Sequence, residues 1–128
     1  MTPPKLVLNV LPDRFAIARL NSSDSIPDWA VSGSFFSVSK TSDELSIVSE
    51  QSKIPQSVKC EYGWRALQVK GPLDFNLTGI LASLASPLAQ AGISIFAIST
   101  YDTDYVLVKE DNLDKAIATF QAAGHQIL

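Results

Sequence analysis

The chain has 128 residues, of which 46% are hydrophobic and 18% are charged. This length suits one compact domain or two very small ones, and this composition supports a buried core and argues against a disordered chain. Ten basic and thirteen acidic residues give a net charge of −3, with no run of lysine or arginine. No nucleic-acid partner is therefore expected.

Cysteine content and hydropathy indicate the cellular compartment in which the protein is expected. Cys60 is the single cysteine, so no internal disulfide can form, which suits a reducing environment. The N-terminus lacks a basic segment before an apolar stretch of signal-peptide length, and no apolar run approaches the ~20 residues that span a bilayer. We expect a cytoplasmic protein with no membrane partner.

The first half of the sequence is typical of β-structure with turns. The expected elements are a strand at 6–10, a turn at Pro12 and Asp13, a return strand at 15–20, a helical turn within 26–31, a hairpin around 41–44 and a strand at 58–62. Trp29 and Trp64 suit core or interface positions better than stacking platforms. This half has no long first helix.

The pattern of apolar and polar residues changes at Gly63. The expected elements are a strand at 64–69, a helix at 74–91 with an apolar face of Leu77, Ile80, Leu81, Leu84 and Leu88, strands at 93–98 and 105–108, a helix capped by Asp111, and a final strand at 126–128. Pro87 interrupts the first helix and removes the bond to the Ser83 carbonyl. Gly92 and Gly124 suit the helix ends.

The second half thus has the order β-α-β-β-α-β, the ferredoxin-like pattern of an α+β fold. We predict two domains, at residues 1–62 and 63–128. A unit of ~65 residues buries little surface alone, so we expect it to be stabilised by contacts with the other half or with a second subunit.

Four segments carry a family resemblance. They are residues 71–75, 77–83, 91–96 and 99–105. In this order and with these gaps, they resemble the ACT domains of the CASTOR arginine-sensor type and their small bacterial relatives. The resemblance covers about residues 63–125. The first half resembles the degenerate ACT-like domain that precedes the ACT domain in the bacterial proteins.

The resemblance implies a regulatory module that binds an amino acid or another small ligand at an interface between paired ACT domains. It also implies a cytosolic protein without catalytic activity. A CASTOR subunit has four such units where this chain has two, so pairing here would require a homodimer. The resemblance does not identify the ligand of this chain.

The loop before the first helix is one candidate half of a ligand site. We expect it to run into a helix N-terminus, whose free N–H groups attract a carboxylate. Its candidate contacts are Gly71, Pro72, Leu73, Asp74, Phe75 and Thr78. The alternative is that Gly71 and Pro72 simply end a strand and Asp74 caps the helix. Gly79, in mid-helix, requires close packing or is merely tolerated.

The polar turn at 99–104 is the other candidate half of the ligand site. Its carboxylates, Asp102 and Asp104, could hold a ligand ammonium, although Asp and Thr are also ordinary turn residues. The CASTOR pattern implies contacts from Thr100, Tyr101 and Asp104. Asp102 is expected to face solvent.

No cofactor, metal site or catalytic residue is predicted. His125 is the single histidine, so a histidine-rich metal site is excluded, and no cysteine-hydrolase signature surrounds Cys60. The favoured function is a ligand-binding regulatory module. The alternatives are a protein-interaction module without a ligand and, least favoured, a small enzyme built on Asp102 and Asp104.

Overall fold

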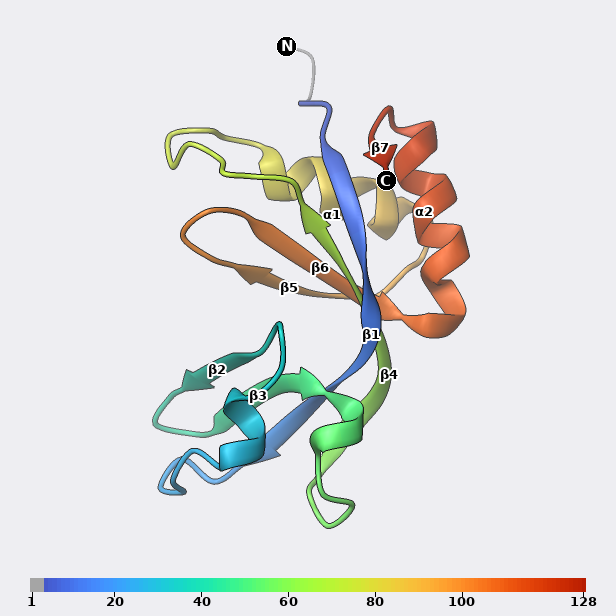
Figure 1. The fold of residues 1–128 in the computed structure, drawn as a ribbon. Helices are drawn as coiled ribbons and strands as arrows, with labels where there is room; N and C mark the ends of the chain where they lie inside the picture. Colours follow the sequence, from blue (N-terminus) through green and yellow to red (C-terminus); the bar gives the residue numbers. More distant parts are fainter. Residues whose placement is uncertain (1–3) are drawn as a thin grey trace. The chain divides into compact units, whose positions relative to one another are not determined.

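The computed structural model describes residues 4–128 as two compact units (Figure 1). The C-terminal unit combines residues 4–12 with Arg65–Leu128, and the N-terminal unit is Asp13–Trp64. Residues 1–3, where the predicted first domain begins, lie outside the described part of the chain. Strands β1 (Val7–Leu20) and β4 (Cys60–Val69) each contribute residues to both units.

The C-terminal unit has the predicted order of strands and helices. After β4 come α1 (Ile80–Gln90), β5 (Ile95–Ser99), β6 (Asp104–Lys109), α2 (Leu113–Ala122) and β7 (Gln126–Ile127). The order β-α-β-β-α-β is therefore confirmed, as is the α+β class. Gly92 and Gly124 follow the ends of the two helices, as predicted.

The sheet of this unit includes the start of the chain. β5 pairs antiparallel with β6 from Ile95↔Val108 to Ser99↔Asp104, β6 lies beside β4, and β4 lies beside β1. β7 pairs with β1 in parallel, with Val7 opposite Gln126. The first residues of β1 thus lie between β7 and β4, so the final strand is held by the N-terminal segment.

The core of this unit lies between the sheet and its two helices. Its fully buried members include Leu8, Leu67, Val69, Leu84, Leu88, Val106, Val108, Ala116 and Phe120. Leu113 and Ile117 pack against it as partly buried residues, which confirms the apolar stripe of α2. Burial of each large apolar side chain in this core stabilises the unit by roughly 1.5–3 kcal/mol.

The N-terminal unit contains the predicted hairpin and helical turn. β2 (Ser37–Lys40) pairs antiparallel with β3 (Leu45–Glu50), which pairs antiparallel with β1 from Phe15↔Glu50 to Leu20↔Leu45. Two 3-10 helices, η1 (Asp28–Val31) and η2 (Gln51–Lys53), flank the hairpin. The small core comprises Ala16, Ala18, Ala30, Leu45, Ile47 and Ile54.

Two strands are longer than the sequence analysis predicted. No turn forms at Pro12, because β1 continues through it. Pro12 lies between the parts of β1 that pair with β7 and with β3, so these ladders do not need its missing N–H. β4 likewise runs through Gly63, which adopts a φ of 80° and donates its N–H to Gln51 Oε1 at 2.9 Å. Glycine tolerates this left-handed conformation within a strand.

Helix α1 is shorter than predicted. It begins at Ile80 rather than at residue 74, because Gly79 at the N-cap adopts a φ of 78° and no side chain caps the helix. Ile80, Leu84 and Leu88 are buried as expected, but Leu77 and Leu81 are 52% and 38% exposed. The loop before α1 is therefore six residues longer, and Gly79 lies at the helix start rather than within the helix.

The start of α2 also differs from the expectation. Asp111 belongs to a short 3-10 helix, Glu110–Asn112 (η3), and α2 begins at Leu113 after Asn112. No side chain caps this helix through a hydrogen bond. Over residues 4–128, no helix is both long and apolar enough to span a bilayer.

Candidate functional site

The loop between β4 and α1 meets the β5–β6 turn around a small cavity. The cavity has a volume of about 200 Å³ and lies within the C-terminal unit. It is lined by Leu73, Asp74, Phe75, Leu77, Ile80, Ser99, Thr100, Tyr101, Asp102, Thr103 and Asp104. Two segments that are separated in sequence by most of α1 and β5 therefore form one surface.

A backbone contact fixes the loop against the turn. The Leu73 N–H donates to the Asp102 carbonyl at 2.7 Å. Gly71 allows the close approach, because a Cβ at this position would lie 3.0 Å from the Asp102 carbonyl oxygen and 3.2 Å from Thr103 Cβ. The Gly71–Pro72 peptide is cis. Gly71 thus permits the contact between loop and turn, and neither Gly71 nor Pro72 lines the cavity.

The turn is organised by Thr100 and Thr103. The Thr100 N–H donates to the Thr103 carbonyl at 2.8 Å, and the Thr103 N–H donates to Thr100 Oγ1 at 3.3 Å. Thr103 is only 6% exposed, and its hydroxyl donates to the Val69 carbonyl at 2.6 Å. Sequence reasoning missed Thr103, because nothing in its spacing marks it as the threonine that points inward.

We expect Thr103→Val to lower the free energy of unfolding by about 1–3 kcal/mol, because the buried Val69 carbonyl would lose its hydroxyl donor. Thr103→Ser keeps the donor and should cost clearly less. Urea denaturation of both variants makes the comparison. Equal losses in the two variants would show that Thr103 acts through its methyl group instead.

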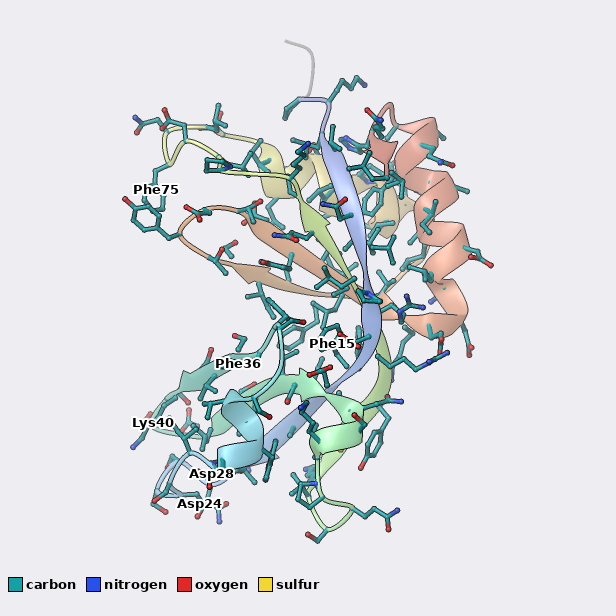
Figure 2. All side chains as sticks on the ribbon, in the orientation of Figure 1. Phe15, Asp24, Asp28, Phe36, Lys40 and Phe75 are labelled. Atoms are coloured by element: carbon teal, nitrogen blue, oxygen red, sulfur yellow. The ribbon has the colours of Figure 1, made fainter. Side chains whose placement is uncertain are left out.

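Two exposed aromatic rings stand beside the cavity. The rings of Phe75 and Tyr101 form an edge-to-face pair with centroids 4.6 Å apart. They are nevertheless 69% and 78% exposed, and Figure 2 shows Phe75 at the outside of its loop. Such contacts are worth about 0.5–1.5 kcal/mol beyond buried area. The pair leaves apolar surface in water at the rim of the cavity.

The charge of the cavity is negative. Asp74, Asp102 and Asp104 line it, and no lysine or arginine does. The pKa of Tyr105, which follows in β6, is raised by burial and by the negative charge of Asp102. The surface therefore favours a cationic group such as an ammonium.

The loop has fewer free donors than the sequence analysis expected. Asp74 does not cap α1; its Oδ1 accepts from the Asn76 N–H at 2.8 Å, and its carbonyl accepts from the Leu77 N–H at 3.0 Å. The Leu73 N–H is also occupied. The expected helix N-terminus lies beyond this loop, since α1 begins at Ile80.

The structure gathers most of the predicted contact residues. Six of the nine line the cavity, namely Leu73, Asp74, Phe75, Thr100, Tyr101 and Asp104. Gly71 and Pro72 lie just outside it, and Thr78 lines a different cavity. Asp102 is exposed, as expected, but it also lines the cavity. Ligand contact by these residues stays a prediction.

Within residues 4–128, no group of three or more His, Cys, Asp or Glu side chains is placed to hold a metal ion. His125 is buried, and both of its ring nitrogens contact backbone groups.

Comparisons with known proteins agree with this architecture. A family model described as ACT domain matches residues 59–122, and a model of an N-terminal domain matches residues 13–57. The protein "Cytosolic arginine sensor for mTORC1 subunit 1" from Bos taurus, like its counterpart from Homo sapiens, is 36% identical over 114 residues. The match covers 77% of this chain and 35% of each relative, so the chain spans about a third of these relatives.

Solved structures extend the comparison. A crystal structure of a protein from Agobacterium tumefaciens has a TM-score of 0.93 and 43% identity, and the match covers 98% of this chain and 93% of that one. Aspartokinase III from E. coli, solved with aspartate and ADP, has a TM-score of 0.66 at 12% identity, covering 96% of this chain and 34% of that one, which shows a shared fold. The chain therefore belongs to the ACT domain family, and its relatives place it with the CASTOR-type members.

Proposed function

We propose that this protein is a non-catalytic regulatory protein that binds a free amino acid at the cavity between residues 73–80 and 99–104. The observation that carries the proposal is the cavity itself, small and lined by three carboxylates in an ACT unit. Its volume of about 200 Å³ lies below the ~300–1,000 Å³ typical of drug-sized ligands, which suits a single small molecule.

One chain offers more partners to the ammonium group of an amino acid than to its carboxylate group. The ammonium has Asp74, Asp102 and Asp104. The carboxylate has few donors, because the N–H groups of Leu73, Asn76 and Leu77 are used within the loop. We therefore propose that a second ACT-type unit closes the site and supplies donors to the carboxylate.

The exposed rim supports a paired assembly. Phe75, Tyr101 and Leu77 leave more than half of their surface exposed beside the cavity, and a covering partner would remove this apolar area from water. β5 also ends the strand order, so one edge of the sheet is free to pair. The proposed assembly is a homodimer in which ACT-type units meet, each chain dividing into a first domain at 1–62 and an ACT domain at 63–128.

Sedimentation at micromolar concentration tests the assembly. We expect a dimer for the full chain and a shift toward monomer for Tyr101→Glu, because a charge would replace an apolar rim side chain. Lys115→Glu, an exposed change on α2, is the control. A monomer at all concentrations, with and without amino acids, would contradict the proposed pairing.

The ligand itself is found by a thermal-shift screen of the twenty amino acids. A ligand that binds only the folded state raises its stability in proportion to the logarithm of its concentration. A relative of this chain is named an arginine sensor, so arginine belongs in the first set. A screen without any shift would favour the second candidate function, a protein-interaction module that uses the exposed Phe75 and Tyr101 without a ligand.

Asp104 is the residue on which ligand affinity should depend most. Asp104→Asn keeps the shape and removes the charge, so we expect weaker binding of the stabilising amino acid by about one to two orders of magnitude. Asp102→Asn should have a smaller effect, because Asp102 is exposed and Asp104 is half-buried. Titration calorimetry on both variants gives the comparison. Unchanged affinity in Asp104→Asn would place the site elsewhere.

A further inference from the structure

The C-terminal unit contains a second, larger cavity on its helical side. Its volume is about 410 Å³, within the ~300–1,000 Å³ of small-molecule sites. Four parts of the chain line it: residues 4–5, residues 78–79, one face of α1, and the end of α2. The lining residues are Pro4, Lys5, Thr78, Gly79, Ala82, Ser83, Ser86, Pro87, Gln90, Ala123 and His125.

The charge of this cavity is opposite to that of the first. Its ionisable lining residues are Lys5 and His125, and no carboxylate lines it. The Lys5 Nζ donates to the Ala123 carbonyl at 2.8 Å, which leaves two of its three donors. No carboxylate among the described residues pairs with Lys5. The Lys5 ammonium therefore presents positive charge that the described chain does not neutralise.

The neutral part of the lining suits a compact organic body. Gly79, Ala82, Pro87 and Ala123 offer small apolar surfaces. Thr78, Ser86 and Gln90 add polar side chains that make no hydrogen bond within residues 4–128. The α1 N-terminus at Gly79 has no side-chain cap and adds positive potential to the same cavity.

From these observations we propose that the cavity lined by Lys5, α1 and the end of α2 binds a small organic monocarboxylate. The carboxylate lies at Lys5, and the uncharged body lies against the small residues of α1. This site is separate from the amino-acid site proposed above and does not depend on it. The two cavities differ in sign of charge, so they select different ligands.

Phenylacetate is a suitable probe, with phenylacetamide as its neutral isostere. We expect phenylacetate, titrated into the full-length ¹⁵N-labelled chain at millimolar concentration, to shift amide resonances of Lys5, Ala82, Ser86 and Gln90. Phenylacetamide should bind about tenfold more weakly, because it lacks the charge that meets the lysine. Equal affinity of the two compounds, or shifts confined to residues 73–77 and 99–104, would overturn the proposal.

Two variants and a control separate charge from shape. Lys5→Met keeps the apolar stem and should weaken phenylacetate binding about tenfold. Ser86→Leu fills the cavity from an exposed position of α1 and should abolish the shifts. Lys115→Met, on α2 outside the cavity, should leave binding unchanged. Undiminished binding in Lys5→Met, with a native thermal unfolding profile, would refute the assignment of the carboxylate to Lys5.

Discussion

Replacement of His125 by alanine is expected to lower the free energy of unfolding by about 2–6 kcal/mol. His125 is 5% exposed, accepts the Leu6 N–H at Nδ1 at 3.1 Å, and places Nε2 3.1 Å from the Ser83 carbonyl. This arrangement requires the proton on Nε2. Alanine would leave the buried Leu6 N–H and the partly buried Ser83 carbonyl without these partners, each at a cost of about 1–3 kcal/mol.

Pro87 provides an internal test of this explanation. The Ser83 carbonyl would normally accept from the N–H of residue 87, which proline lacks. Pro87→Ala restores that donor, so it should recover part of the stability lost in His125→Ala. A double-mutant cycle measured by urea denaturation gives the coupling. Gln121→Ala, exposed on α2, is the control, and additive effects of Pro87→Ala and His125→Ala would contradict the explanation.

Gly33→Ala is expected to lower the free energy of unfolding by about 2–5 kcal/mol. Gly33 has a φ of 98°, and the left-handed region costs other residues roughly 1–2 kcal/mol. A Cβ would also overlap Glu50 Oε2 and lie 3.0 Å from Glu50 Cδ. Displacing the mostly buried Glu50 carboxylate adds about 1–3 kcal/mol, as for other overpacked sites.

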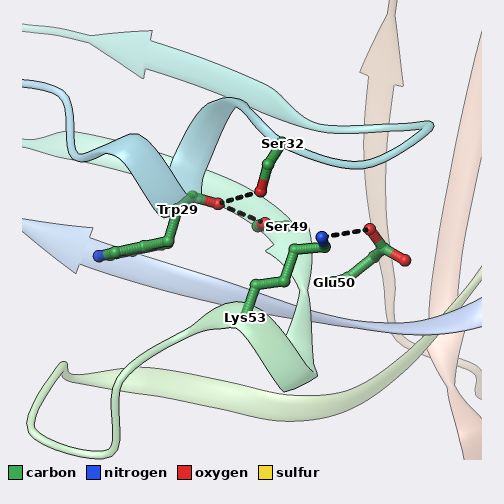
Figure 3. A network of polar contacts seen from close by, with 5 residues as sticks. All are labelled: Trp29, Ser32, Ser49, Glu50 and Lys53. Atoms are coloured by element: carbon green, nitrogen blue, oxygen red, sulfur yellow. Dashed lines mark hydrogen bonds and ion pairs between the residues drawn. The ribbon is translucent and has the colours of Figure 1, made fainter.

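Glu50 lies in a partly buried polar region of the N-terminal unit. Its Oε2 is buried without a hydrogen bond and lies 3.9 Å from Lys53 Nζ (Figure 3). Beside it, the Trp29 carbonyl accepts from Ser49 Oγ at 3.2 Å and from Ser32 Oγ at 3.3 Å. The Glu50 carboxylate is thus mostly buried beside these groups, and it must move for a Cβ at position 33 to fit.

Gly63→Ala is the matched control for Gly33→Ala. Gly63 has a similar φ of 80°, but a Cβ there would meet nothing within 4 Å. Chemical denaturation should therefore show only the backbone cost at Gly63 and a larger loss at Gly33. The double variant Gly33→Ala/Glu50→Ala should recover the difference. Equal losses at the two glycines would mean that Glu50 moves aside at no cost.

The sequence predicted the fold well where hydrophobic periodicity was strong. β5, β6 and the apolar stripe of α2 follow their patterns, because alternation and helical spacing depend on local burial. The start of α1 did not follow its pattern. Leu77 continues the helical spacing, but Gly79 takes a left-handed conformation that no count of apolar residues reveals.

Long-range partners explain the other differences. Pro87 indicated that the Ser83 carbonyl lacks a helical donor, but His125, which supplies it, lies 42 residues further along. Asp74 was a reasonable cap by sequence, yet it closes its own turn. The candidate site was predicted in outline, since the loop and turn do meet. The structural role of the buried Thr103 could not be predicted, because it depends on a hydrogen bond to the Val69 carbonyl.

The position of β1 between β7 and β4 has a consequence for dissecting the protein. A fragment of residues 63–128 would lack residues 4–12, so β7 would lose its parallel neighbour and His125 would lose the Leu6 N–H. Such a fragment should be unstable alone. A synthetic peptide of residues 4–12 should restore its structure by complementation, in the manner of a split protein whose missing strand is supplied from outside.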